Sequence, residues 1–187
     1  EFGLLVGAPI LTGSLSRLFL GIWADQYGGR IVNVAVMVLS ALATWLLTFA
    51  SSYPEFLLAG LGLGLAGGSF SVSITYVSKF FPAEKQGAAL GIVGAGNVGA
   101  AVTKFAAPIV MAAMGWKGVA NVWAVGLIVA AVIFFAFTKD DPELAARRAS
   151  GTKPRSFAAQ FEPLRSVQVW RFSLYYFFVF GGFVALS

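Results

Sequence analysis

One arginine stands in the middle of the first apolar run of this chain. Arg17 lies eight residues before Asp25, which is about 12 Å along a helix. Holding a guanidinium at that depth costs about 2.5–3.5 kcal/mol on insertion scales. Its fork donates two parallel hydrogen bonds to a flat oxyanion. We therefore expect Arg17 to contact a substrate anion. The alternative is an ion pair with a buried carboxylate that holds the helices together.

The neighbours of Arg17 favour the first interpretation. Gly13 and Gly21 lie one turn to either side of it, so small residues line its face. Such a face suits another helix or a cavity better than lipid. Every acidic residue except Glu1 stands in a connection or at the end of an apolar run. These runs therefore offer Arg17 no interior carboxylate.

A second apolar run carries an amide and a lysine on one helical face. Asn97 and Lys104 are seven residues apart, about two helical turns. Asn97 is expected either to contact a substrate or to bond a neighbouring helix. Lys104 is expected either to line the same path or to extend toward the membrane surface. A small residue recurs every fourth position on another face and predicts close helix packing: Gly87, Gly91, Ala95 and Gly99.

A third run repeats the spacing of small residues with Gly60, Gly64 and Gly68. Beside Phe70 it then presents three hydroxyls on a polar face, those of Ser69, Ser73 and Tyr76. Hydroxyls at such positions mostly bond carbonyls of their own helix.

Several classes of chemistry are excluded by the composition. The chain has no cysteine and no histidine, so disulfides and His/Cys metal sites are absent from it. It has no Gly-rich phosphate loop and no nucleophile elbow. We expect no catalytic residue, no metal, no cofactor and no nucleic-acid partner.

The elements that position these residues are membrane-spanning helices. Apolar residues make up 58% of the chain and charged residues 11%, against about 25% charged in a soluble domain. A span needs about 20 apolar residues, and only helices satisfy their backbone within each such segment. The sequence predicts an all-α membrane protein with six apolar blocks: 3–24, 31–50, 56–79, 87–113, 119–137 and 168–187.

Basic residues predict the orientation of these blocks. Taken alternately, the connections place ten basic residues on one side of the membrane and only Lys117 on the other. By the positive-inside rule the first side is cytoplasmic. The ten are Arg30, Lys79, Lys85, Lys139, Arg147, Arg148, Lys153, Arg155, Arg165 and Arg171.

The long polar stretch 138–167 divides the chain. We interpret it as a solvated cytoplasmic linker between two helical bundles, with residues 1–137 before it and 168–187 after it. Its short segment 156–161 is the alternative candidate for a helix on anionic lipid. Because the chain begins and stops inside apolar runs, we expect it to be a fragment of a longer transporter-like protein.

The connection GIWADQYGGR, residues 21 to 30, resembles the loop between the second and third spans of the major facilitator superfamily. The matching residues are Gly21, Asp25, Tyr27, Gly28 and Arg30. The usual basic residue after the aspartate is replaced by Gln26. That loop is cytoplasmic in the superfamily, in agreement with the basic residues. The resemblance implies a bundle of twelve spans, of which this chain holds six.

Two further stretches are similar to the nitrate/nitrite porters of that superfamily. GAGNVGAA, residues 94 to 101, resembles their nitrate signature, and GGSFSVSITYVSKFFPAEKQG, residues 67 to 87, their fourth span and following loop. The resemblance implies a second substrate arginine beyond Ser187. It also implies substrate contacts from Arg17, Asn97, Gly96, Phe70, Tyr176 and Phe180.

The resulting hypothesis is a secondary transporter of nitrate or nitrite in the cytoplasmic membrane, acting as a monomer. Proton symport needs a titratable group, for which Lys104 is the candidate, whereas nitrate/nitrite exchange does not. One rival is a carrier of another organic or phosphate-type anion. The other is a membrane scaffold or sensor that transports nothing.

Overall fold

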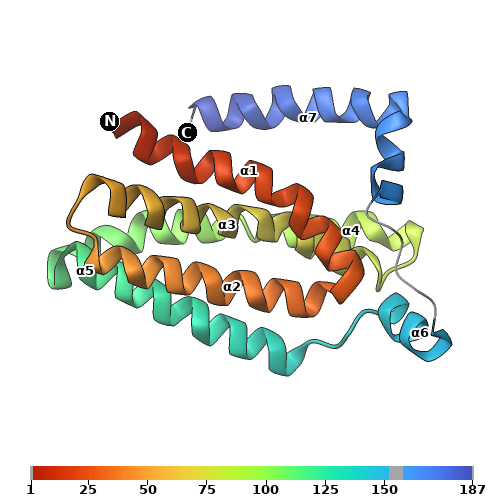
Figure 1. Cartoon of the computed structure of the whole chain (residues 1–187), viewed down its shortest axis with the longest axis horizontal. Coiled ribbons are helices and arrows are strands. Elements are labelled where there is room, and N and C mark those ends of the chain that lie inside the picture. The colour runs from red at the N-terminus through yellow and green to blue at the C-terminus, as the bar shows by residue number, and fades with distance from the viewer. Residues whose placement is uncertain (1, 152–157, 187) are drawn as a thin grey trace. The chain divides into compact units, whose positions relative to one another are not determined.

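The computed structural model describes residues 2–151 and 158–186. It divides the chain into two units, residues 1–152 and 153–187, and each is described by itself. The first unit contains α1 (Phe2–Tyr27), α2 (Gly29–Leu46), η1 (Leu47–Phe49), α3 (Tyr53–Ser78), α4 (Ala83–Ala95), α5 (Val98–Phe137) and α6 (Pro142–Ser150). The second contains η2 (Ala158–Arg165) and α7 (Val167–Leu186) (Figure 1).

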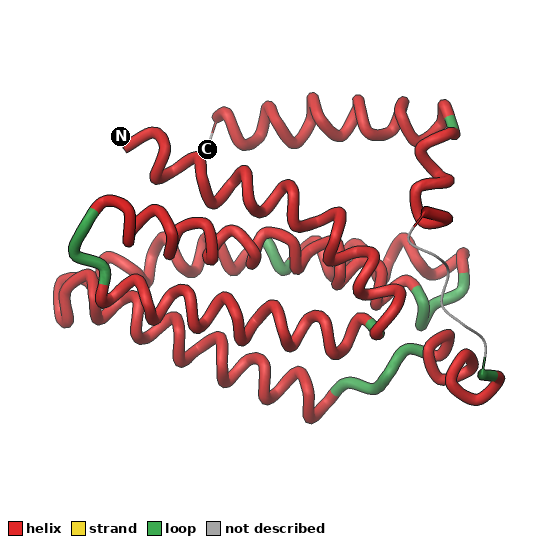
Figure 2. The backbone as a smooth tube through the Cα atoms, viewed as in Figure 1, coloured by secondary structure: helices red, strands yellow, loops and turns green. Residues whose placement is uncertain are grey.

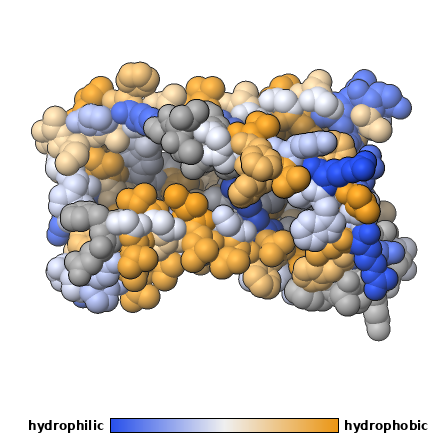
Figure 3. All heavy atoms as spheres, turned by 90° about the horizontal axis from the view of Figure 1, so that it is seen from above, coloured by the Kyte–Doolittle hydropathy of each residue, from blue (hydrophilic) through white to orange (hydrophobic). Residues whose placement is uncertain are grey.

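Within the described ranges, four stretches are long and apolar enough to cross a membrane: Gly3–Tyr27, Gly29–Phe49, Tyr53–Ser78 and Ala83–Phe137. The last is 55 residues long and combines the fourth and fifth predicted blocks. The predicted sixth block corresponds to α7. Hydrophobic side chains cover much of the face seen in Figure 3, as expected for a surface that meets lipid.

The helices of the first unit pack around α3, which contacts α1, α2 and α4, while α5 packs on α2. Buried apolar side chains from α1, α2 and α3 form the core cluster: Leu20, Ala24, Val32, Val36 and Val72. At one end of α3, Ser52 and Glu55 form a capping box. This box satisfies backbone donors that the helix start would otherwise leave unpaired.

The predicted packing stripe on α3 is confirmed. A Cβ added at Gly64 would lie 2.5 Å from the carbonyl oxygen of Pro9 and 2.7 Å from Cβ of Thr12, both on α1. One added at Gly68 would press on Leu20 and on Ser16 Oγ, the latter at 2.8 Å. Because only hydrogen fits at Gly64, the two helix backbones lie in contact there.

The close helix packing predicted for the small-residue stripe of the fourth block is wrong for this unit. A Cβ added at Gly87, Gly91 or Gly99 would meet nothing within 4 Å among the described residues. The physical reason is that α4 packs mainly on α3, while these glycines of α4 and of the start of α5 face open space among the described residues.

The fourth block is also not one continuous helix. Between α4 and α5 the chain turns at Gly96 and Asn97, where Asn97 N–H donates to Gly94 and Ala100 N–H donates to Asn97, at 3.1 and 3.0 Å. These bonds join residues three apart, as in a 3₁₀ turn. The turn interrupts the helical tube within its length (Figure 2).

The predicted connection over residues 114–118 is reduced to a single residue. Gly115 has φ 70° and ψ 179° inside α5, a conformation that glycine adopts far more readily than other residues. Around it α5 turns back on itself, so that its two halves lie side by side (Figure 1).

The contact between α1 and α3 predicts a difference between two alanine substitutions on α3. Gly64→Ala should lower the free energy of unfolding of the full-length protein by about 1–3 kcal/mol, because the methyl group overpacks the crossing. Gly60→Ala is the matched control, since its Cβ would meet Pro9 Cγ at an ordinary 3.6 Å. It should leave stability unchanged or raise it by up to about 1 kcal/mol. Denaturant unfolding in detergent measures both, and equal effects would contradict this account of the crossing.

Candidate functional site

Arg17 lies at the contact between α1 and α3 and is half-buried. Its Nε donates a hydrogen bond to the carbonyl oxygen of Gly67 on α3, at 3.1 Å. One turn earlier, a Cβ added at Gly13 would lie 2.9 Å from the carbonyl oxygen of Gly64. The guanidinium therefore stands beside a stretch where α1 and α3 touch backbone to backbone.

The α3 residues predicted beside this site divide into two groups. Phe70 is half-buried and lies three residues after Gly67, so the structure places Phe70 and Arg17 on adjacent, packed helices. Ser69 Oγ donates to the carbonyl of Ala66 in its own helix, as predicted. Ser73 and Tyr76 instead donate to other elements, to Asn33 Oδ1 at 3.2 Å and to the carbonyl of Lys139.

Gly96 and Asn97 form the turn between α4 and α5, and both are exposed. Within the described part of the chain, the Asn97 side chain makes no hydrogen bond to a neighbouring helix, and as the residue preceding α5 it makes no capping bond. The contacts of this turn do not join it to Arg17.

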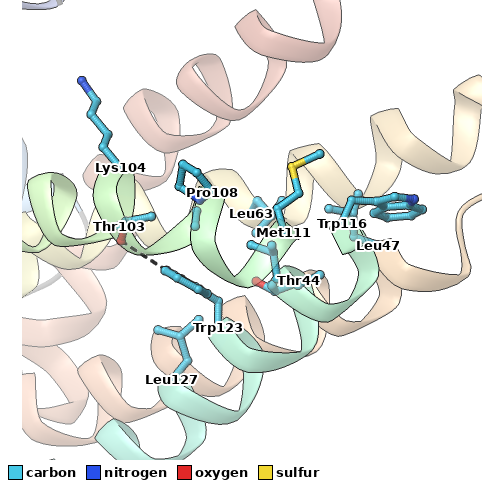
Figure 4. Close-up of a pocket in the computed structure, with 13 residues that line it drawn as sticks. Thr44, Leu47, Leu63, Thr103, Lys104, Pro108, Met111, Trp116, Trp123 and Leu127 are labelled. Carbon is cyan, nitrogen blue, oxygen red and sulfur yellow. Dashed lines mark hydrogen bonds between the residues drawn. The ribbon is translucent and has the colours of Figure 1, made fainter. Parts of the chain in front are cut away.

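Lys104 lies on the rim of an apolar cavity of about 670 Å³ between α2, α3 and the two halves of α5. Its ammonium extends away from the other labelled side chains (Figure 4). The cavity lining includes Thr103, whose Oγ1 accepts a hydrogen bond from Trp123 Nε1 at 3.2 Å across the two halves of α5. Lys104 is exposed, and no ion pair joins it to another described residue.

The two predicted residues of the last block belong to the second unit. Tyr176 lies on α7 and is 49% exposed. Phe180 lies on the same helix, but its side chain is outside the described residues. Each unit is described by itself, so the relation of these two residues to Arg17 stays a prediction.

The turn from α1 to α2 is held by charged side chains. Gly28 has φ 97°, which strongly favours glycine. Lys79 Nζ lies 2.8 Å from Asp25 Oδ1, and Arg30 Nη1 lies 3.6 Å from Asp140 Oδ1. Arg30 also donates to the carbonyl of Phe135 at 2.5 Å.

With Gln26 in the usual basic position, Asp25 takes its cation from the end of α3. A Cβ added at Gly21, in contrast, would meet no neighbouring element within 4 Å among the described residues.

The segment that sequence reasoning missed is α6, which lies in the predicted linker but docks on this turn. Leu144 is 5% exposed, and its Cδ2 would lie 2.6 Å from a Cβ at Gly28. Asp141 caps the helix by accepting from the N–H of Leu144 at 2.7 Å. Arg147 donates to the carbonyl of Asp25 at 2.6 Å. A start signal was present in the sequence, since aspartate followed by proline opens helices.

The alternative surface helix over residues 156–161 falls partly outside the described residues. Ala158–Arg165 form the 3₁₀ helix η2, and residues 156 and 157 are not described.

The helical bundle and its charged α1–α2 turn belong to a known family of membrane proteins. The chain belongs to the Major Facilitator Superfamily, whose family model matches residues 1–187. Together with its long apolar helices, this makes it a multi-pass membrane protein. No solved structure matches the chain significantly.

Curated relatives match the chain over its whole length. A probable nitrate/nitrite antiporter of Thermus thermophilus is 42% identical over 206 aligned positions, which cover 100% of this chain and 45% of the relative. A nitrite extrusion protein of Bacillus subtilis is 33% identical, with 100% and 46% covered. A probable nitrate transporter of Staphylococcus epidermidis is 31% identical, with the same coverage. The chain thus spans about half the length of these relatives.

The docking of α6 predicts the effect of a charge on its buried face. Leu144→Asp removes a buried apolar side chain worth at least about 2 kcal/mol, and that loss corresponds to about thirtyfold in a local equilibrium constant. Hydrogen exchange of the amides of residues 142–150 in the full-length protein should therefore accelerate about thirtyfold. Ala145→Asp adds the same charge at the adjacent exposed position and should leave exchange unchanged. Equal protection in both variants would show that α6 does not depend on Leu144.

Proposed function

We propose that the full-length protein is a secondary transporter that moves nitrate, nitrite or both across the cytoplasmic membrane by alternating access. The observation that carries this proposal is Arg17, a half-buried guanidinium within a long apolar helix, with Nε fixed to the backbone of α3 at 3.1 Å. The names of the relatives, nitrate/nitrite antiporter and nitrate transporter, supply the chemical class of the anion.

An anion that enters the protein must leave water, which costs hydration free energy. A bare anion in a medium of low dielectric constant loses several kcal/mol of hydration free energy, and a nearby guanidinium offsets that loss. Its planar donor geometry also matches an oxyanion that is itself flat, which a lysine does not reproduce. Arg17 would thus provide both the charge and the orientation for nitrate.

The remaining site residues take roles that follow from the resemblance to nitrate/nitrite porters. Asn97 would donate hydrogen bonds to the anion oxygens, with Gly96 leaving space beside it. Phe70, Tyr176 and Phe180 would lie on the flat faces of the anion and close access to it. A second arginine beyond Ser187 would complete the neutralisation. The exposure of Asn97 supports such a role, because its amide is not consumed by a neighbouring helix.

The architecture proposed for the whole protein is two helical bundles. Residues 1–137 supply five spans of the first bundle, residues 138–167 the cytoplasmic connection, and residues 168–187 the first span of the second. In transporters of this superfamily the site lies near the midplane between the halves, and rocking of the halves exposes it to each side in turn. Transport requires no catalytic residue and no cofactor, and we propose that the protein acts as a monomer.

Two modes of coupling are compatible with this site. Nitrate/nitrite exchange needs a charged site that does not reorient when empty. Proton symport needs a group that gains and loses a proton during the cycle. We propose symport through Lys104, which lies two turns from Asn97 on the same helical face and has no carboxylate partner among the described residues.

The function is tested by removing the charge of Arg17. Arg17→Gln should lower kcat/KM for nitrate uptake by the full-length protein in proteoliposomes about 30-fold or more, because loss of one partner of a buried charge pair costs about 2–5 kcal/mol. Uptake of labelled nitrate measures the effect.

The control for this experiment is Arg148→Gln, the same substitution at an arginine with a 58% exposed side chain. It should leave uptake unchanged. Nitrate uptake that survives Arg17→Gln would argue for the scaffold or sensor. Uptake of a larger organic or phosphate-type anion in preference to nitrate would argue for the other rival.

Coupling is tested with the gradients themselves. In the symport mode, an inward proton gradient drives nitrate accumulation without internal nitrite, and Lys104→Gln abolishes that dependence while Lys117→Gln, at another exposed lysine, retains it. Uptake that appears only with internal nitrite would instead identify an exchanger and leave Lys104 without a role in coupling.

A further inference from the structure

The residue that accepts the hydrogen bond of Arg17, Gly67, also lies at a close contact between α1 and α3. The carbonyl oxygen of Gly67 accepts the bond from Arg17 Nε at 3.1 Å. A Cβ added at Gly67 would lie 3.3 Å from Cα of Gly13 on α1. Gly67 therefore combines a tight contact with the α1 backbone and a hydrogen bond to the guanidinium.

We propose that Gly67 is a positioning residue for the anion site. It acts through Arg17 and does not itself contact the anion. Its missing side chain lets α1 approach closely enough for the backbone carbonyl to hold Nε, and the rest of the guanidinium is thereby oriented. This inference rests on the proposed function of Arg17.

The distances explain why one methyl group matters here. Hydrogen bonds from nitrogen to oxygen lie between about 2.7 and 3.2 Å and weaken steeply beyond that range. The Arg17–Gly67 bond, at 3.1 Å, is already near the upper limit. A methyl group 3.3 Å from Gly13 Cα is tighter than ordinary van der Waals contact, so that α1 and α3 must separate by about 0.2 Å to restore a carbon–carbon distance of at least 3.5 Å. That separation lengthens and weakens the bond while leaving the helices packed.

Two other glycines on α3 provide matched controls. At Gly60, an added Cβ meets α1 at an ordinary distance of 3.6 Å, to Pro9 Cγ. At Gly62, it would lie 2.8 Å from Cβ of Ala43, which is on α2. Gly62→Ala therefore disturbs the packing of α3 more severely than Gly67→Ala but in a different direction, away from Arg17.

The experiment compares the nitrate KM and the maximal uptake rate of the three alanine variants in full-length protein, together with their thermal midpoints. Gly67→Ala should raise KM about three- to tenfold, the factor expected for partial loss of a hydrogen bond to a charged group, with little change in midpoint. Gly62→Ala should lower the midpoint and keep the wild-type KM. Gly60→Ala should keep the wild-type KM and leave the midpoint unchanged or slightly higher. An unchanged KM in Gly67→Ala, or an equal rise in Gly62→Ala, would overturn the positioning role.

A double-substitution cycle separates positioning from general loosening of the bundle. Binding is measured as the nitrate-induced rise in thermal midpoint, which needs no turnover. In an Arg17→Lys background the bond to Gly67 through Nε no longer exists, so Gly67→Ala should add nothing to the loss of nitrate binding. Effects that add in full would mean that Gly67→Ala acts independently of Arg17.

A second variant covers the case in which Gly67→Ala does not fold. Gly68→Ala presses on Leu20 and Ser16 of α1, but only on side-chain ends that can rotate. It should raise KM about twofold, less than Gly67→Ala because α1 moves less, and a wild-type KM in this variant would then overturn the proposal. If the wild-type protein moves no nitrate, the proposed function fails and this inference with it. If it does, an unchanged KM removes the positioning role alone.

Discussion

Contact between the backbones of α1 and α3 is the constraint on which the first unit depends. Glycines on both helices, Gly13 on one side and Gly64 and Gly67 on the other, remove every side chain that would hold the helices apart. The approach brings the carbonyl of Gly67 within reach of Arg17 and closes the apolar cluster around Val72. A charge can be held inside an apolar bundle only where polar atoms are this near, because hydrocarbon offers it none.

At the end of the bundle where α1 turns into α2, many charged side chains pair with one another. There the charges are many, and the structure pairs them across elements that are distant in sequence: Asp25 with Lys79, and Arg30 with Asp140. Helix α6 adds Leu144 as an apolar contact and Arg147 as a donor to the last turn of α1. Residues 141–150 are consequently part of the first unit and contact the helix that carries Arg17.

Much of this arrangement could be predicted from the sequence, because long apolar segments admit only helices and an interior arginine is rare. The helical spans, the glycine stripe of α3 and the turn over residues 21–30 follow from such local rules. Other features depend on partners that a pattern does not name. The stripe of Gly87, Gly91 and Gly99 is as regular as that on α3, yet it faces no described neighbour. Whether a small-residue face is occupied is decided by the surrounding helices. The roles of Asn97, Tyr176 and Phe180 likewise depend on groups from both bundles. They remain predictions.

The reversal at Gly115 has a mechanical consequence. Because no connecting loop separates its two halves, α5 has no flexible segment that would let one half slide along the other. The hydrogen bond between Trp123 and Thr103 ties the two halves together a second time, well away from the reversal. Together these two attachments keep the two halves of α5 side by side, and α2 packs against them. Helix α4 packs on α3 instead, so the two sides of the turn at Gly96 and Asn97 pack on different helices.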